Sequence, residues 1–352
     1  SNEAMATIYE PVLSKPPFPV VDSSFVDLLV SGLVSDGTLE ISRNEAPMPS
    51  LAVNAGETVL PPAPLLMGPN LFKVRAIHQN GDRSLWSEES VVIRNEPPAA
   101  VSGLQATASG FSALVQWDPV VDPEVVGYEV SRDGEARATL EPITHAGEVT
   151  GTDVPYSWGF TNGAQFSFDQ NLGTVWVPAT DSPDPFVTLT LAEPAMISRV
   201  SLQFVKADQF YYLGSGVVAD YRIDVRWEGR FLPALTIRGN QAESVEHELP
   251  APFLTDAVRV VLLGAARRPA TGISEVGLQA MRYNPADPTS LQDAGLTDGR
   301  YRYAVSAVDR YGAVGQSGGA EVAVGDVEPP APPLNLTAIV VGSDVRLNWV
   351  GG

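Results

Sequence analysis

Two copies of the motif Glu-Pro-Pro-Ala lie 232 residues apart in this chain, beginning at Glu96 and at Glu328. The similarity continues after the motif, where the matching pairs are Leu104 and Leu336, Ala106 and Ala338, Gly110 and Gly342, and Trp117 and Trp349. The residues before the motif repeat as well, since 72–77 match 303–308 and Gly81 matches Gly312. Repetition at a fixed offset marks copies of one structural unit. The chain therefore contains more than one domain of the same kind.

The repeated segments alternate apolar and polar residues with a period of two and are punctuated by Pro and Gly. No stretch sustains the 3.6-residue period of an amphipathic helix, so the pattern predicts antiparallel strands and an all-β fold of packed sandwiches. A length of 352 residues with 44% apolar residues is enough for several such domains, each with its own core.

Composition excludes several classes of function. The formal charge of −20 argues against a nucleic-acid partner or an anionic membrane surface, because both require a positive field. No run of about 18 apolar residues occurs, so we expect no direct membrane insertion. Cysteine is absent and only three histidines are present, which removes disulfides, thiolate nucleophiles and most histidine-based catalysis.

Residues 97–134 have a Pro-rich start, a strand that ends at Trp117, and then Tyr128-Glu129-Val130, and in these features they resemble a fibronectin type III domain. The second half of that pattern begins only at Gly295. There, Tyr303 in Tyr-x-Val-x-Ala matches the tyrosine-corner strand, which implies that its hydroxyl bonds back to nearby backbone. The same resemblance implies core packing for Trp117 and Trp349.

A fibronectin type III domain needs roughly 90 to 100 residues, so the 232-residue repeat leaves an excess of about 130 to 140 residues. The excess contains strand-like runs at 186–191, 221–225 and 258–263, which predict a folded domain inserted into a loop of its host. The predicted domains are a fibronectin III or immunoglobulin-like sandwich over 1–95, a split fibronectin domain over 96–140 plus 289–327, an inserted domain over 141–288, and the first strands of a further fibronectin domain over 328–352.

The inserted segment resembles the discoidin, or coagulation-factor type C, family of galactose-binding-like jelly rolls. The matching stretches run in the order of that family: 168–176, 186–191, 197–202, 221–225, 257–260 and 272–276. The resemblance implies an all-β jelly roll that binds its ligand through loops at one end.

The same resemblance implies a structural calcium ion held by the loop before Trp176 and by a glutamate near the last strand. The implied ligands are Asp169, Asn171 through its backbone carbonyl, Thr174 and Glu275, together with a carbonyl near Phe166. Calcium prefers six to eight oxygen ligands, and these groups are of that type. A metal-free turn in which Asp169 and Asn171 bond their own backbone remains the alternative.

Sugar sites combine an aromatic face with fixed donors such as arginine. The candidate ligand-binding residues of the inserted segment are Trp158, Phe210, Tyr211, Tyr212, Arg267 and Arg268. Trp158 has a competing role in the core, and the two arginines are equally compatible with an ordinary charged surface.

No catalytic motif is present and no two acids are paired by their spacing, so we expect no enzyme activity and no catalytic residue. We expect a non-catalytic extracellular or cell-surface module that binds a glycan or a surface polysaccharide, with the fibronectin-like domains as spacers. The alternatives are a structural phage virion component, which would contact other subunits of a virion or surface assembly, and part of a secreted glycan-processing enzyme.

Overall fold

The computed structural model describes residues 12–14, 20–21, 23–33, 35–152, 163–178, 182, 184–205, 217–264, 272–325 and 334–350. These residues form strands throughout, with a single 3-10 helix, η1 (Ala164–Ser167), and no α-helix in the described ranges. The prediction of an all-β fold is confirmed. No helix within these ranges is long and apolar enough to cross a membrane.

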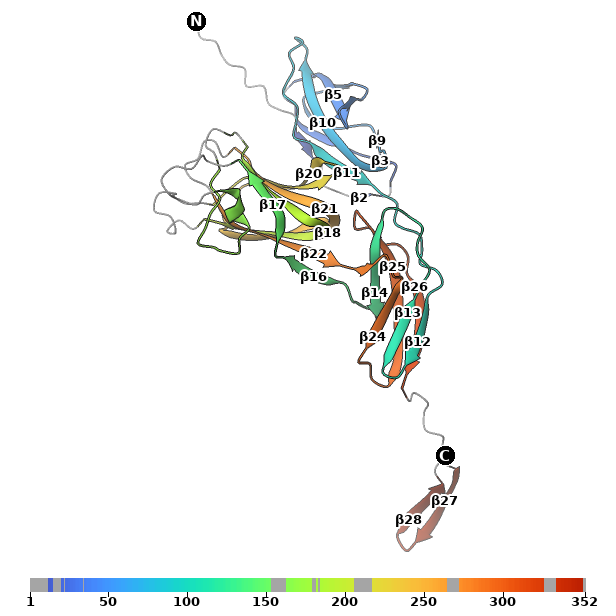
Figure 1. Ribbon diagram of the computed structural model, residues 1–352. Helices are drawn as coiled ribbons and strands as arrows, with labels where there is room; N and C mark the ends of the chain where they lie inside the picture. The colour runs from blue at the N-terminus through green and yellow to red at the C-terminus, as the bar shows by residue number, and fades with distance from the viewer. Residues whose placement is uncertain are drawn as a thin grey trace.

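The first domain is a sandwich whose larger sheet has β10 at its centre (Figure 1). That sheet has the order β2 (Val20–Val21), β11 (Ser90–Arg94), β10 (Gly68–His78), β5 (Gly37–Arg43), β6 (Ala46–Pro47), with β7 (Leu51–Val53) also on β5. Two smaller sheets contain β1 (Val12–Ser14), β4 (Leu29–Leu33) and β8 (Gly56–Val59), and β3 (Phe25–Val26) with β9 (Ala63–Pro64). Inward residues such as Leu28, Leu39 and Phe72 are fully buried between the layers.

A second sandwich is assembled from two stretches of chain that lie far apart in the sequence. One sheet is β12 (Gln105–Ser109), β13 (Ser112–Gln116) and β24 (Ser290–Ala294). The other is β15 (Glu135–Ala136), β14 (Val125–Arg132), β25 (Gly299–Asp309) and β26 (Gly318–Val324), with β23 (Asn284–Pro285) on β14. Trp117, Tyr128 and Tyr303 lie in the core of this split domain.

The repeated residues of the first and split domains have the same local structure. Ile77 forms an isolated bridge with Arg83, and Val308, which is 231 residues later, forms the same bridge with Val314. The glycines in these turns, Gly81 and Gly312, have φ values of 88° and 77°, a conformation that favours glycine.

Between the two halves of the split domain, the chain forms a separate seven-stranded sheet. Its order is β16 (Thr139–Ile143), β22 (Ile273–Arg282), β18 (Phe186–Phe204), β21 (Ser244–Leu262), β19 (Tyr221–Trp227), β20 (Arg230–Ile237), and β17 (Ala146–Gly151) also pairs with β18. Register shifts interrupt the 19-residue strands β18 and β21. Residues 187–191 of β18 pair with β17, whereas residues after Met196 pair with β22. The two long strands therefore bend, and each contributes to both layers around one core.

The inserted domain packs against both of its neighbours. Its core cluster includes Leu71, Val91 and Ile93 from the first domain and Tyr311 from the split domain. At Gly68, a Cβ atom would meet the Tyr311 hydroxyl at 3.4 Å and Trp227 of the inserted domain at 3.9 Å. All three domains meet at this point.

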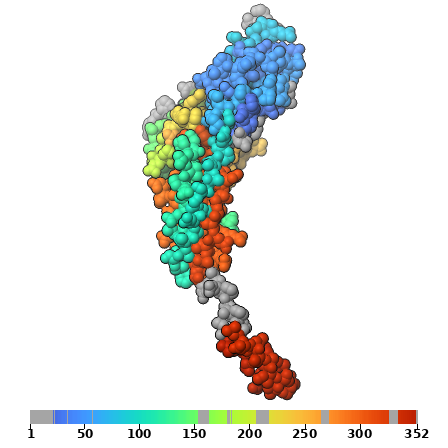
Figure 2. Space-filling model, turned by 90° about the vertical axis from the view of Figure 1, so that its right-hand side faces the viewer, coloured from blue at the N-terminus to red at the C-terminus, as the bar shows by residue number. Residues whose placement is uncertain are grey.

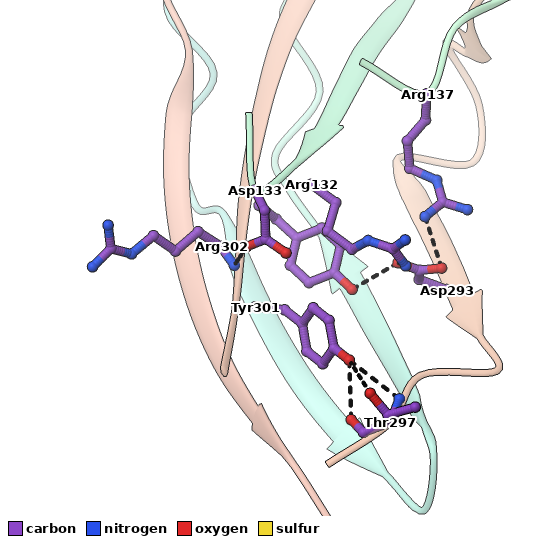
Figure 3. A network of polar contacts seen from close by, with 8 residues as sticks. Arg132, Asp133, Arg137, Asp293, Thr297, Tyr301 and Arg302 are labelled. Carbon is purple, nitrogen blue, oxygen red and sulfur yellow. Dashed lines mark hydrogen bonds and ion pairs between the residues drawn. The ribbon is translucent and has the colours of Figure 1, made fainter. Parts of the chain in front are cut away.

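The tyrosine-corner prediction for Tyr303 is wrong, and Figure 3 shows Tyr301 next to Thr297. Its hydroxyl donates to Asp293 Oδ2 at 2.8 Å, not to backbone. The Tyr301 hydroxyl instead donates to the Thr297 carbonyl at 3.0 Å and accepts the Thr297 N–H at 3.1 Å. Tyr303 lies two residues further along β25, about 7 Å from Tyr301, and so reaches β24 and not the turn.

Strands β27 (Leu334–Val341) and β28 (Asp344–Val350) form a hairpin that lies apart from the other strands (Figure 2). Trp349, which we expected to pack in a core, is 59% exposed on this hairpin. A two-stranded hairpin has no opposing layer against which to bury a side chain.

Candidate functional site

Six strand ends of the inserted domain meet at one end of its sandwich. Phe186 at the start of β18 pairs with Val261, and Tyr221 at the start of β19 pairs with Leu262. The rings of Tyr221 and Phe204 lie 5.4 Å apart. Phe204 is the last residue of β18, so both ends of this strand lie at this end of the sandwich. Ile273 at the start of β22 pairs with Phe204, and Gly151 at the end of β17 pairs with Val187.

Trp176 is the side chain around which these ends are arranged. It is fully buried and its backbone exchanges two hydrogen bonds with Ile273, at 2.9 and 3.0 Å. A Cβ atom on Gly151 would lie 3.4 Å from its Nε1, so β17 also approaches this ring. Gly272, at the start of β22, is equally confined, because a Cβ there would meet the Trp176 carbonyl at 2.8 Å.

The predicted ligand-binding residues belong to three segments, 153–162, 206–216 and 265–271, which lie outside the described residues. Trp158 is in the first segment; Phe210, Tyr211 and Tyr212 are in the second; Arg267 and Arg268 are in the third. The residues that flank these segments are described. Val205 donates its N–H to Gly272, and Gly264 donates its N–H to Asp184 Oδ1 at 3.2 Å. The described residues next to these segments therefore lie at the same end of the domain.

The loop before Trp176 gathers oxygen atoms around Thr174. The Thr174 hydroxyl lies 2.9 and 2.8 Å from the two carboxylate oxygens of Asp169 and 2.6 Å from the Asn171 carbonyl. The Asn171 side-chain oxygen accepts the Gly173 N–H at 3.0 Å, so its backbone carbonyl, and not its amide, faces this cluster. Asp169 Oδ1 also accepts the Asn171 N–H at 3.0 Å, which is the turn geometry expected without a metal.

Glu275 approaches the same loop from β22. Burial raises the pKa of Glu275 to about 7; the negative charge of Asp169 adds to this, and backbone N–H groups of the 169–171 turn oppose it. Its Oε2 atom is buried and has no hydrogen-bond partner in the described structure. A buried carboxylate oxygen without a partner is unfavourable unless a cation or a proton satisfies it.

These groups fit a calcium ion in their chemistry. Two carboxylates, a hydroxyl and a backbone carbonyl are hard oxygen ligands. Within the described ranges no cluster holds three or more His, Cys, Asp or Glu side chains, so a metal here would depend on carbonyl and hydroxyl oxygens in addition to Asp169 and Glu275.

His247 on β21 is one of the three histidines and is half-buried. The Tyr221 hydroxyl lies 2.6 Å from His247 Nε2, and burial lowers the pKa of the imidazole. Its neighbours Glu246 and Glu248 both pair with Arg199. The histidine is therefore part of the packing beside β19, with the Tyr221 hydroxyl as its hydrogen-bond partner.

Sequence reasoning did not single out Arg259 on β21. Its guanidinium lies between the rings of Phe186 and Phe231, with centroid distances of 4.2 and 3.6 Å. Strand alternation places Arg259 opposite the buried Val258 and Val260, so its outward direction could be predicted. The two rings belong to other strands, and only the sheet order brings them to either side of the cation.

No protein-family model matches this sequence, and no curated protein matches it. Several solved structures are similar in part. One is a chitosan-binding module from a chitosanase/glucanase of Paenibacillus sp. IK-5, with 14% identity and a TM-score of 0.32 over 38% of this chain and 93% of that one. Another is the family 32 carbohydrate-binding module of Streptococcus pneumoniae EndoD, with 16% identity and a TM-score of 0.29 over 42% and 97%. A third is the family 32 module of C. perfringens NanJ in complex with galactose, with 12% identity and a TM-score of 0.30 over 40% and 93%.

Proposed function

We propose that the inserted domain is a non-catalytic carbohydrate-binding module of an extracellular protein, and that the sandwiches on either side of it hold it in a fixed position. The observation that supports this most directly is that the described residues flanking the three segments, Thr152, Val205, Gly264 and Gly272, lie at one end of the domain. Gly151 and Gly272 approach the buried Trp176 at this end.

The composition of the three segments suits a saccharide. They supply aromatic rings, at Trp158 and 210–212, and two arginines, at 267 and 268. Aromatic faces contact the C–H side of a sugar ring, and arginine donates to its hydroxyls. A rigid sandwich beneath such loops reduces the conformational entropy that binding would otherwise cost.

The test is binding of the full chain to an array of neutral glycans that includes galactose, N-acetylgalactosamine and chitosan oligomers. We expect binding that is lost in Phe210→Ala, Tyr211→Ala or Arg267→Ala and retained in Phe111→Ala, which removes an aromatic ring that is 63% exposed on the split domain. Absence of binding by the unmodified chain to every glycan on the array would contradict the proposal.

We also propose that a structural calcium ion braces the loop at 168–176. Asp169, Thr174, Glu275 and the Asn171 carbonyl would hold it, and the unpartnered oxygen of Glu275 supports this assignment. The ion would fix the loop against β22 and would take no part in chemistry.

A further inference from the structure

The outer face of the inserted sheet carries a cation held rigidly between two aromatic rings. Arg259 Cζ lies 4.2 Å from the ring centroid of Phe186 and 3.6 Å from that of Phe231. Its Nε donates to Thr188 Oγ1 at 2.9 Å, and Thr188 is itself buried. Three contacts from two strands, β18 and β20, therefore fix the plane of the guanidinium. Its position is set before any ligand arrives.

The two neighbouring arginines on β19 already have carboxylate partners. Arg222 binds Asp224 through two bonds of 2.6 and 2.9 Å, and Arg226 binds Asp256 at 2.7 Å. Arg259 has no such partner among the described residues. The charge of Arg259 is therefore not neutralised by an ion pair in the described ranges, and Asp224 acts on it only through a charge interaction without contact.

The terminal nitrogens of Arg259 remain available. Neither Nη atom has a hydrogen-bond partner in the described ranges, and Arg259 is partly exposed. Burial lowers the pKa of Arg259, and Arg222 and Arg226 lower it further against the opposing effect of Asp224. An anion bound in the plane of the guanidinium, in addition to Asp224, would favour the charged form of Arg259.

The shape of the accessible group selects the kind of anion. A guanidinium with its Nε already occupied offers its two Nη atoms as a fork, which matches the two oxygens of a carboxylate. On the same cross-strand row, Thr150 lies next to Thr188, which lies next to Arg259. Thr150 is exposed, and its hydroxyl has no partner among the described residues. It lies two strands from Arg259, about 10 Å away.

We propose that this face, formed by Phe186, Arg259, Phe231 and Thr150, is a second binding site, which takes an acidic saccharide by its carboxylate. Arg259 receives the carboxylate in the plane of its guanidinium, and Thr150 receives a hydroxyl of the adjoining sugar. The site consists of strand residues on the outer face of the sheet and includes none of the residues 153–162, 206–216 and 265–271. The choice of a saccharide over another carboxylate rests on the function proposed above.

The experiment measures binding of the full chain to a galacturonic acid tetrasaccharide by calorimetry, with its methyl ester as the matched neutral probe. We expect the acid to bind and the ester to bind at least about tenfold more weakly, because the ester loses a charge-assisted pair. Arg259→Gln should weaken binding of the acid by about the same factor. Arg259→Lys should not restore it, because lysine has no planar fork.

The matched control is Arg230→Gln, which removes one exposed arginine of the same domain that pairs with Glu45. It should leave binding of the acid unchanged, and melting curves of all variants verify that they are folded. Equal affinity for acid and ester, or full binding by Arg259→Gln, would overturn the proposal. Equally tight binding of a polyglutamate peptide at this face would overturn the assignment to a saccharide. Binding of neutral glycans at the loops should persist in Arg259→Gln, so failure of either proposal is visible separately.

Discussion

One buried carboxylate, Asp293, joins the two stretches of chain that form the split domain (Figure 3). It is 1% exposed and accepts from Arg132 at 2.9 Å and Arg137 at 2.8 Å, both of which precede the inserted domain. It also accepts the Tyr303 hydroxyl, which follows the inserted domain. Within the split domain, this network therefore links the chain before the inserted domain to the chain after it.

We expect Asp293→Ala to lower the free energy of unfolding by about 2 kcal/mol, because the buried Tyr303 hydroxyl loses its acceptor while the two arginines can turn to water. Urea denaturation measures this. The control is Glu321→Ala, which also removes a carboxylate between two arginines, Arg300 and Arg302, that are 69% and 81% exposed. It should cost less than about 1 kcal/mol. Equal losses in the two variants would contradict the role of burial.

His247 should make stability depend on pH. Burial lowers the pKa of His247 in the folded protein below its unfolded value of about 6.5, so protons bind preferentially to the unfolded chain. Its contribution is therefore constant above pH of about 6.5 and is lost as the pH falls below that value. We expect His247→Gln to reduce the fall in melting temperature between pH 7.5 and 5.5, whereas His145→Gln, at an exposed position, should leave it unchanged. A pH dependence that is the same in all three proteins would contradict this.

At the scale of elements, the loop at 168–176 and strand β22 should respond together to calcium. Saturating calcium should stabilise the unmodified chain by about 2 kcal/mol, since a ligand at about a hundred times its Kd contributes slightly more than this. Glu275→Gln should abolish the response, and Glu193→Gln, at an exposed acid of the same domain, should retain it. Melting curves with calcium and with chelator, together with elemental analysis, measure the effect. An unchanged curve in the unmodified chain and no bound metal would contradict the calcium proposal.

The strands were predictable from sequence because the alternation of apolar and polar residues follows from the geometry of the strand backbone alone. Val187, Leu189 and Leu191 point inward because successive residues of a strand face opposite sides, and all three are buried. The bends of β18 and β21 were not predictable in the same way. They depend on register shifts such as that between Thr190 and Ala195, which are defined only by the partner strand.

The candidate site was also predictable from sequence only in part. The order of residues from Asp169 to Trp176, followed by Glu275 about a hundred positions later, indicated an oxygen-rich loop and a distant carboxylate. That Glu275 is buried and unpartnered beside Asp169 could not be read from the chain, because burial depends on what packs above a side chain. For the same reason Arg259 between two rings was not visible in the sequence.

At the scale of the whole molecule, the first, inserted and split domains are in direct contact with one another. Asp309 is 1% exposed at the contact between the first and split domains. Its carboxylate accepts from Asn95 Nδ2 at 2.5 Å, from the Tyr311 N–H at 2.9 Å and from the Ala313 N–H at 3.0 Å. Asn95 directly precedes the Glu96-Pro97 linker, so this one side chain ties the linker to the β25 turn.

We expect Asp309→Ala to lower the free energy of unfolding by about 3 kcal/mol, because three buried donors lose their acceptor. The first domain should also separate from the others, which small-angle scattering would record as a larger radius of gyration. Asp298→Ala, at an exposed acid of the same domain, is the control and should change neither measurement. An unchanged radius of gyration in Asp309→Ala would contradict the role of this carboxylate in holding the first domain in place.

The sequence by itself determined the strands, the repeat and the presence of extra residues between the halves of one copy, because each of these follows from local alternation or from matching residues such as Gly81 and Gly312. Tertiary structure alone decided which side chains lose water and which partners they receive. Tyr311 packs where three domains meet, and Asp293 links the two halves of the split domain. The physical reason is that hydration and electrostatic pairing depend on neighbours from distant parts of the chain, whereas strand alternation depends only on the backbone.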